Sequence, residues 1–117
     1  MTKRDIIDIC LSLKDSYEDY PFDLDASLIN AWAVIRHKSN KRGFAHIYIE
    51  GEKPIVNIKL HPAQADFYRQ AYSSIKPAYH MNKEHWSGID PNGDVPIELL
   101  MALVETSYDL TKPKSKK

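Results

Sequence analysis

The stretch FAHIYIEGEKPIVNIKL, residues 44–60, decides the fold class. Aliphatic side chains alternate on both sides of the turn at Gly51, at positions 45, 47 and 49 and again at positions 56, 58 and 60. A period of two is the pattern of a β-strand with one buried face, and a glycine-containing turn between two such runs indicates a hairpin. The stretch therefore predicts two antiparallel strands whose aliphatic face packs against helices.

The other face of these two predicted strands is mixed. It carries aromatic and polar side chains, namely Phe44, His46 and Tyr48 in the first run and Ile55, Asn57 and Lys59 in the second. Such a face is typical of a sheet that is half exposed to water. Two interpretations remain open, a solvated face and a recognition face.

The segments before the hairpin predict one helix and one strand. Thr2 and Asp5 resemble a capping box, and apolar side chains then recur at helical spacing up to Tyr17, which predicts a helix over about residues 3–16. Residues 31–37 form a strand-like run, joined to the hairpin by the basic turn of residues 38–43.

The segments after the hairpin predict two helices around a short β-rich region. His61-Pro62 starts a helix whose apolar stripe is Ala63, Phe67, Ala71 and Ile75, and Pro77 stops it. Residues 77–93 predict two short strands around a bend. A last helix begins near residues 94–96 and carries Ile97, Leu100, Leu103, Val104 and Tyr108 at helical spacing.

The resulting order, α-β3-α-β2-α, predicts an α+β fold, a two-layer sandwich with three helices on one face of a five-stranded antiparallel sheet. We expect Ile47, Ile58, Leu100 and Leu103 in its core. Residues 1–111 form a single predicted domain, because 117 residues fit one domain and leave no room for two. Residues 112–117 are predicted to be a flexible Lys-rich tail, either a frayed end or an electrostatic arm.

Composition limits the classes of protein. Hydrophobic residues make up 43% and charged residues 27%, which excludes wholesale disorder. No apolar run approaches the ~20 residues of a membrane span, the N-terminus does not resemble a signal peptide, and the single cysteine cannot form an internal disulfide. We therefore expect a soluble cytoplasmic protein without a membrane segment. Without the four lysines of residues 112–117, 12 basic residues stand against 16 acidic ones, so nucleic-acid binding would be modest and salt-dependent.

Residues 77–86, PAYHMNKEHW, concentrate chemically versatile side chains. His80 and His85 lack the further ligands of a zinc pattern, and no nucleophile motif or glycine-rich phosphate loop accompanies them. The sequence thus predicts no metal, no cofactor and no enzymatic activity. One interpretation is packing alone; the other is a partly exposed groove, since unpaired polar groups are costly to bury. The predicted groove residues are Trp32, Tyr79, His80, Asn82, His85 and Trp86.

Several separated motifs resemble the MmcQ/YjbR family of bacterial proteins over nearly the whole chain. They are Tyr79-His80-Met81-Asn82-Lys83 with His85-Trp86, the early Glu18-Asp19-Tyr20-Pro21-Phe22, Trp32, Phe44-Ala45, Lys59, Pro62 and the closing Ser107-Tyr108-Asp109-Leu110. The resemblance implies an α-β3-α-β2-α fold of the kind also seen in secretion chaperones. It also implies a DNA-binding role through a "double-wing" arrangement of the sheet.

From the resemblance and the charges we expect a non-catalytic module that binds DNA weakly and in a salt-dependent manner. The expected phosphate contacts are Arg36, Lys38, Lys41, Arg42, Lys59 and Lys83. The alternative is a protein- or peptide-binding module of chaperone or adaptor type. The chaperone-like architecture and the mixed sheet face favour this alternative.

Overall fold

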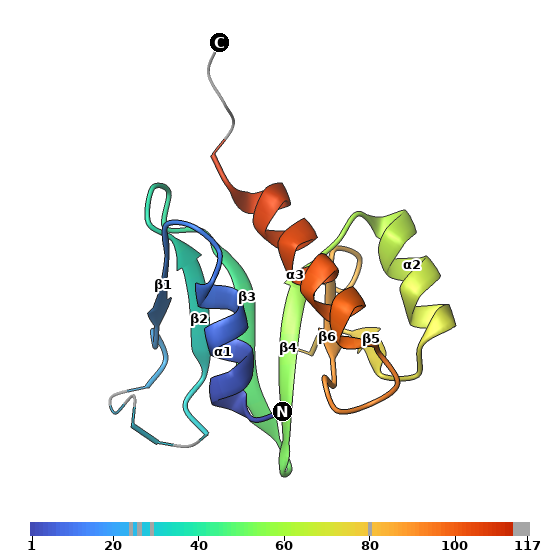
Figure 1. Ribbon diagram of the computed structural model, residues 1–117, viewed down its shortest axis with the longest axis horizontal. Helices are drawn as coiled ribbons and strands as arrows, with labels where there is room; N and C mark the ends of the chain where they lie inside the picture. The colour runs from blue at the N-terminus through green and yellow to red at the C-terminus, as the bar shows by residue number, and fades with distance from the viewer. Residues whose placement is uncertain (24, 26, 29, 80, 114–117) are drawn as a thin grey trace.

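A computed structural model gives the structure of the chain and describes residues 1–23, 25, 27, 28, 30–79 and 81–113. The elements are α1 (Lys3–Leu11), β1 (Ser16–Asp19), β2 (Ala33–His37), β3 (Gly43–Glu50), β4 (Lys53–Lys59), α2 (Pro62–Ala71), β5 (Ile75–Pro77), β6 (Trp86–Ile89) and α3 (Ile97–Thr111). The strands form one antiparallel sheet in the order β1-β2-β3-β4-β6-β5. Helices α1 and α3 lie across one face of this sheet, and α2 flanks its β5–β6 side (Figure 1). The predicted α+β class is confirmed.

The hydrophobic core lies between the sheet and the helices. Ile47 and Ile58 from the central hairpin are fully buried there, and they belong to the same apolar cluster as Leu100 and Leu103 of α3. All four predicted core residues are therefore confirmed. Burial of this aliphatic face is the main favourable contribution to folding.

The central hairpin departs from strict alternation at Phe44. A bulge shifts the register between β2 and β3, because Ile35 pairs with Ala45 whereas Arg36 pairs with Gly43. Phe44 is left without a partner and packs against Tyr108 of α3, with ring centroids 5.2 Å apart. The prediction that Phe44 shares the open face with His46 was wrong, because the extra residue of a bulge reverses the direction of one side chain.

The sheet has six strands, not five, because the predicted first helix is too long. The capping box of Thr2 and Asp5 is present, but α1 ends at Leu11, and Asp15 then adopts a positive φ of 55° that turns the chain. Residues 16–19 pair with β2 as an edge strand. Helical spacing at Tyr17 was misleading, since the edge of β2 offers backbone groups with which these residues pair as a strand.

The buried side of α2 also differs from the predicted stripe. The helix ends at Ala71, Phe67 is 64% exposed, and Ile75 belongs to β5. The helix instead turns Ala65 towards the core, and Tyr68 and Tyr72 pack there partly buried. Spacing alone could not distinguish these two stripes, because both repeat at helical intervals.

A hydroxyl on α3 joins the helix to the central hairpin. Ser107 Oγ donates to the carbonyl of Phe44 at 2.6 Å and accepts from the backbone N–H of Lys59 at 2.8 Å. Both backbone groups would otherwise lie unpaired in the interior. Within the described residues, no helix has the length and apolarity that crossing a membrane would require.

Candidate functional site

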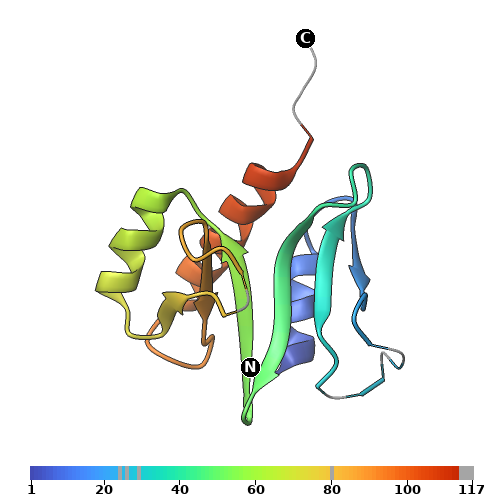
Figure 2. The same cartoon turned by 180° about the vertical axis from the view of Figure 1, so that it is seen from behind.

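The face of the sheet opposite the helices is the candidate site, and Figure 2 shows it from behind. Register places the relevant side chains on this open face: His46 of β3 pairs with Asn57 of β4, and Lys59 of β4 pairs with Trp86 of β6. The face is therefore formed from three neighbouring strands.

An aromatic row crosses the open face. The ring of Trp32, just before β2, stacks on Tyr48 with centroids 4.4 Å apart and planes 4° apart. Trp32 Nε1 also donates to His46 Nδ1 at 3.0 Å, and His46 meets the edge of Trp86 at 5.4 Å between centroids. The rings of Phe22 and Trp32 form a T-shaped pair, with centroids 6.2 Å apart. The structure thus brings the predicted groove residues Trp32 and Trp86 together through His46, and Tyr48 extends the row beside Trp32; the sequence prediction selected neither His46 nor Tyr48.

The environment of this row shifts two titrating groups. Burial lowers the pKa of His46 to about 4, and the nearby charge of Arg36 contributes to the shift. The imidazole is therefore neutral near pH 7. Burial raises the pKa of Tyr48, and the negative charge of Glu50 raises it further. Both rings act as neutral aromatic surface in this pH range.

The segment before β6, residues 81–85, is held mainly by hydrogen bonds to its backbone. Arg69 of α2 donates to the carbonyl of Lys83 at 2.6 Å and to that of Trp86 at 2.8 Å. Asn82 Oδ1 accepts from the backbone N–H of Glu84 at 2.9 Å, so this predicted groove residue caps a turn. Lys83 is exposed.

The remaining predicted groove residues before β6 are His85, Tyr79 and His80. His85 is half buried, and its carbonyl accepts from the backbone N–H of Leu60 at 2.8 Å. Tyr79 is 58% exposed, and its carbonyl lies 3.5 Å from Asn57 Nδ2. His80 lies outside the described residues.

Asn57 has an unusual environment. Its side chain is fully buried, and its Oδ1 accepts no hydrogen bond from any described residue. A buried acceptor without a donor costs about 1–3 kcal/mol. A Cβ on Gly88 would stand 2.9 Å from this oxygen, so glycine leaves the space that Asn57 needs. The sequence showed Asn57 only as one polar position in an apolar strand.

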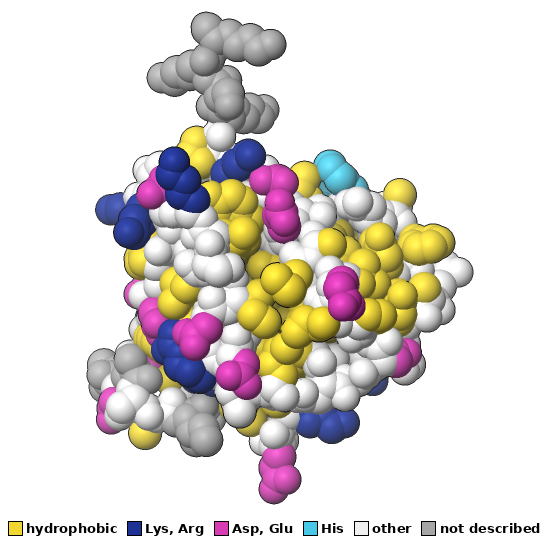
Figure 3. Space-filling model, in the orientation of Figure 1, with side chains coloured by type: hydrophobic (Ala, Val, Ile, Leu, Met, Phe, Trp, Pro, Cys, Tyr) yellow, Lys and Arg dark blue, Asp and Glu magenta, His cyan; other side chains and the backbone are white. Residues whose placement is uncertain are grey.

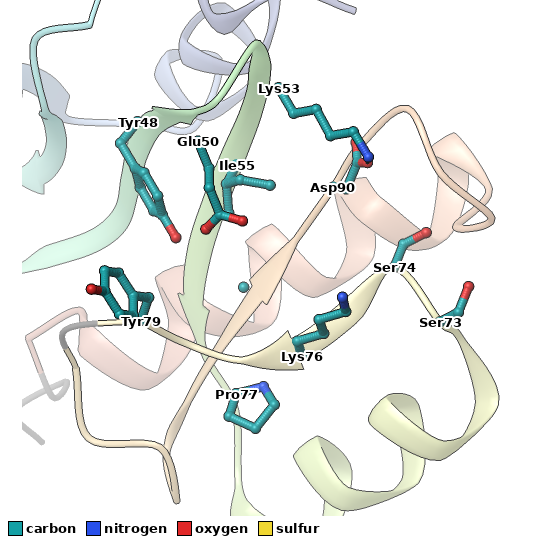
Figure 4. A pocket seen from close by; sticks show the side chains of 11 residues that line it. Tyr48, Glu50, Lys53, Ile55, Ser73, Ser74, Lys76, Pro77, Tyr79 and Asp90 are labelled. Carbon is teal, nitrogen blue, oxygen red and sulfur yellow. The ribbon is translucent and has the colours of Figure 1, made fainter.

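Two neighbouring hollows lie on the open face near the end of β3. One, of about 290 Å³, is lined by residues of β3, β4, β5 and β6, including Tyr48, Glu50, Lys76 and Gly88 (Figure 4). The other, of about 370 Å³, is lined by Asn30, Trp32, Tyr48, Ile49, Glu50, Gly51 and Tyr79. Tyr48, Glu50 and Tyr79 line both hollows. Among the described side chains, no group of three His, Cys, Asp or Glu residues is placed to hold a metal ion.

Basic side chains gather at the opposite end of β3. The β2–β3 turn carries Lys38, Lys41 and Arg42, all exposed, and Asn40 Nδ2 ties this turn to the carbonyl of Thr111 at 3.0 Å. The end of α3, where Lys112 follows Thr111, therefore lies beside the turn (Figure 1). Figure 3 shows Lys and Arg side chains gathered at this end of the molecule. We call Lys38, Lys41, Arg42 and Lys112 the basic end.

Two of these charges, those of Arg42 and Lys112, act on the same buried histidine. Burial lowers the pKa of His37, at the base of the turn, and the charges of Arg42 and Lys112 lower it further. In the described part of the chain, Lys112 has an ion pair with Asp109 at 3.1 Å, and none is seen for the three cations of the turn.

Two of the predicted phosphate contacts, Arg36 and Lys59, lie in strands and not in the exposed turn. Arg36 forms an ion pair with Asp19 of β1, with Nε 2.8 Å from Oδ2, so its charge is largely neutralised. Lys59 stands beside Trp86 in the sheet. Because Ile58 pairs with Ala45, Lys59 lies towards the Gly43 end of β3, the same end as the basic turn.

Comparison with known proteins gives consistent matches. The family model YjbR matches residues 11–110. The curated uncharacterized protein YjbR of Escherichia coli K12 is 32% identical over 84 residues, which cover 72% of this chain and 71% of that protein. Uncharacterized protein YyaQ of Bacillus subtilis strain 168 is 33% identical over a match that covers 90% of this chain and 96% of that protein.

Solved structures with the same fold include two bacterial proteins. The crystal structure of a protein from Pseudomonas syringae matches with a TM-score of 0.81 at 29% sequence identity. The match covers 96% of this chain and 100% of the Pseudomonas chain. The crystal structure of a Deinococcus radiodurans protein with the domain DUF419 matches with a TM-score of 0.81 at 33% sequence identity. The match covers 99% of this chain and 82% of the Deinococcus chain.

Proposed function

This chain belongs to the YjbR family, and from that premise and the charges of the basic end we propose that it is a non-catalytic module that binds DNA through phosphate contacts. One observation carries the proposal. The turn cations Lys38, Lys41 and Arg42 converge with Lys112 at one end of the molecule, and none of these three has an ion pair within the described residues.

A projecting basic turn suits contact with a nucleic-acid backbone. Its exposed cations can neutralise phosphates and release counterions, which is the main source of sequence-independent affinity. The turn also buries little, so its side chains are free to follow a groove or straddle a strand. Such a turn matches what a wing of the "double-wing" type would need.

Further basic residues extend the footprint from the turn. Lys59 and Trp86 lie on the open face towards the same end of the sheet, and Lys83 is exposed just before Trp86. Neighbouring strands are spaced about 4.8 Å apart, so a duplex at the turn could reach the β4–β6 pair. The acidic excess elsewhere predicts weak binding.

Paired charge removals test this proposal. Replacing Lys38 and Arg42 by alanine should weaken binding to an AT-rich and a GC-rich duplex by the same factor, because phosphate contacts do not read sequence. The control variant replaces Lys53 and Lys76, two exposed lysines near the hollows, and removes the same charge. Fluorescence anisotropy at low salt measures all three proteins. Equal weakening by both variants would show a net-charge effect and would refute a localised contact.

A second candidate function is protein or peptide binding. The aromatic row and the neighbouring Tyr79 favour it, because Phe22 is 70% exposed and Tyr79 is 58% exposed. Aromatic side chains with polar neighbours are enriched in protein interfaces. If the anisotropy experiment detects no duplex binding at low salt, this candidate becomes the leading one.

A further inference from the structure

The hollow of about 370 Å³ beside Trp32, Tyr48 and Tyr79 has a composition that the DNA proposal does not use. Three aromatic side chains form its walls, and Glu50 supplies the one ionisable carboxylate among its lining residues. It lies at the Glu50 end of β3, whereas the basic turn precedes Gly43 at the other end. The two sites are therefore separate.

Glu50 is a carboxylate without a counter-ion. Within the described residues no ion pair includes it, although Lys53 is its cross-strand partner, because Lys53 Nζ is directed to Asp90 Oδ2 at 3.9 Å. Figure 4 shows the Glu50 carboxylate beside the Tyr48 hydroxyl and the Lys53 ammonium beside Asp90. The negative charge of Glu50 also contributes to the raised pKa of Tyr48, which places the carboxylate within electrostatic reach of that ring.

The adjoining hollow, of about 290 Å³, has a different charge balance, because Lys53, Lys76 and Asp90 line it together with Glu50. Asn57 Oδ1 is buried, lacks a donor among the described residues, and stands on the side of Gly88 where a side chain would project. Gly88 lines the hollow of about 290 Å³ that shares Tyr48, Glu50 and Tyr79 with the first. Among the described residues, the lining of the hollow of about 370 Å³ thus combines a carboxylate and three aromatic side chains without a lysine or arginine, a combination that prefers a positive charge.

We propose that the hollow of about 370 Å³ binds an organic cation, an ammonium or guanidinium group, with Glu50 as its counter-ion and Trp32, Tyr48 and Tyr79 as its walls. Aromatic faces attract cations through their quadrupole, and a carboxylate at the rim adds a direct charge contact. A phosphate would be repelled by Glu50, and a neutral apolar group would desolvate this carboxylate without compensation.

The cation has two possible sources, a free amine or the arginine or lysine side chain of a peptide. Titration followed by ¹⁵N NMR separates them, with the backbone signal of Gly51 and the indole N–H of Trp32 as reporters. The probes are tetramethylammonium, Nα-acetylarginine amide, the neutral Nα-acetylnorleucine amide and the peptide acetyl-Gly-Arg-Gly-amide. We expect both simple cations to shift the reporters and the norleucine compound to leave them unchanged. Tighter binding of the peptide than of acetylarginine amide assigns the site to peptides, and equal binding assigns it to free amines.

Two glutamates on the same hairpin provide a matched pair of variants. Glu50→Gln should weaken the acetylarginine amide about fivefold, the effect of one partly exposed charge contact. Glu52→Gln should leave the affinity unchanged, because Glu52 lines a different hollow beside Lys3 and Arg4. Both positions are exposed, so both variants should fold. Equal binding of the norleucine compound, or an unchanged affinity in Glu50→Gln, would overturn the proposal. Displacement of acetylarginine amide by oligothymidine would also overturn it and would identify a nucleobase site.

Discussion

Replacing Leu100 by alanine is expected to lower the free energy of unfolding by about 2–5 kcal/mol. Leu100 is 1% exposed and belongs to the core cluster formed by α3 and the central hairpin. The substitution removes apolar contacts and leaves a cavity, because α3 is fixed to the hairpin by Ser107 and cannot settle into the space. Urea unfolding followed by circular dichroism measures the change.

The next residue on the same helix gives the control for this prediction. Met101 is 49% exposed, so Met101→Ala should change stability by no more than about 0.5 kcal/mol. Similar midpoints for Leu100→Ala and the wild-type protein would contradict the placement of α3 on the sheet.

Acidification is expected to destabilise the protein through His46. The pKa of His46 is about 4 in the folded protein and about 6.5 in an unfolded chain, so the unfolded state binds the proton first as the pH falls. The stabilisation from the neutral imidazole is therefore complete above pH 6.5 and is lost as the pH falls towards 4. Between pH 7 and pH 4.5 the wild-type protein should lose about 2–3 kcal/mol more than His46→Gln.

The comparison with His46→Gln cancels the effect of other groups. His37 also has a lowered pKa through burial, but it titrates in both proteins. Parallel profiles for the wild-type protein and His46→Gln would show that His46 is not held neutral by its contacts with Trp32 and Trp86.

The sequence predicted those parts of the fold in which burial imposes a period. Alternation in residues 44–60 predicted the central hairpin, and Leu100 and Leu103 were predicted in the core because helical spacing brings them to one face. It did not predict β1, because Tyr17 continues a helical spacing and only the unpaired edge of β2 makes a strand favourable there. The bulge at Phe44 depends on packing against Tyr108, which is distant in the sequence.

The candidate site was predicted in part for the same reason. Alternation placed His46 and Tyr48 on the open face, but their contacts with Trp32 depend on how the chain enters β2. No sequence pattern could show that Asp19 neutralises Arg36, or that α3 ends beside the basic turn. The convergence of charge at the basic end is a property of the tertiary structure.

The salt dependence of duplex binding by the intact protein tests the central claim most directly. With about four to five phosphates neutralised, the logarithm of affinity should fall against the logarithm of salt concentration with a slope of about −4. Fluorescence anisotropy across a salt series gives this slope, and removal of residues 112–117 shows how much of it belongs to the tail. A slope that stays near −3 without the tail is the predicted result, because Lys38, Lys41 and Arg42 remain. No binding at low salt, or binding that disappears entirely with the tail, would contradict the basic end as a DNA contact.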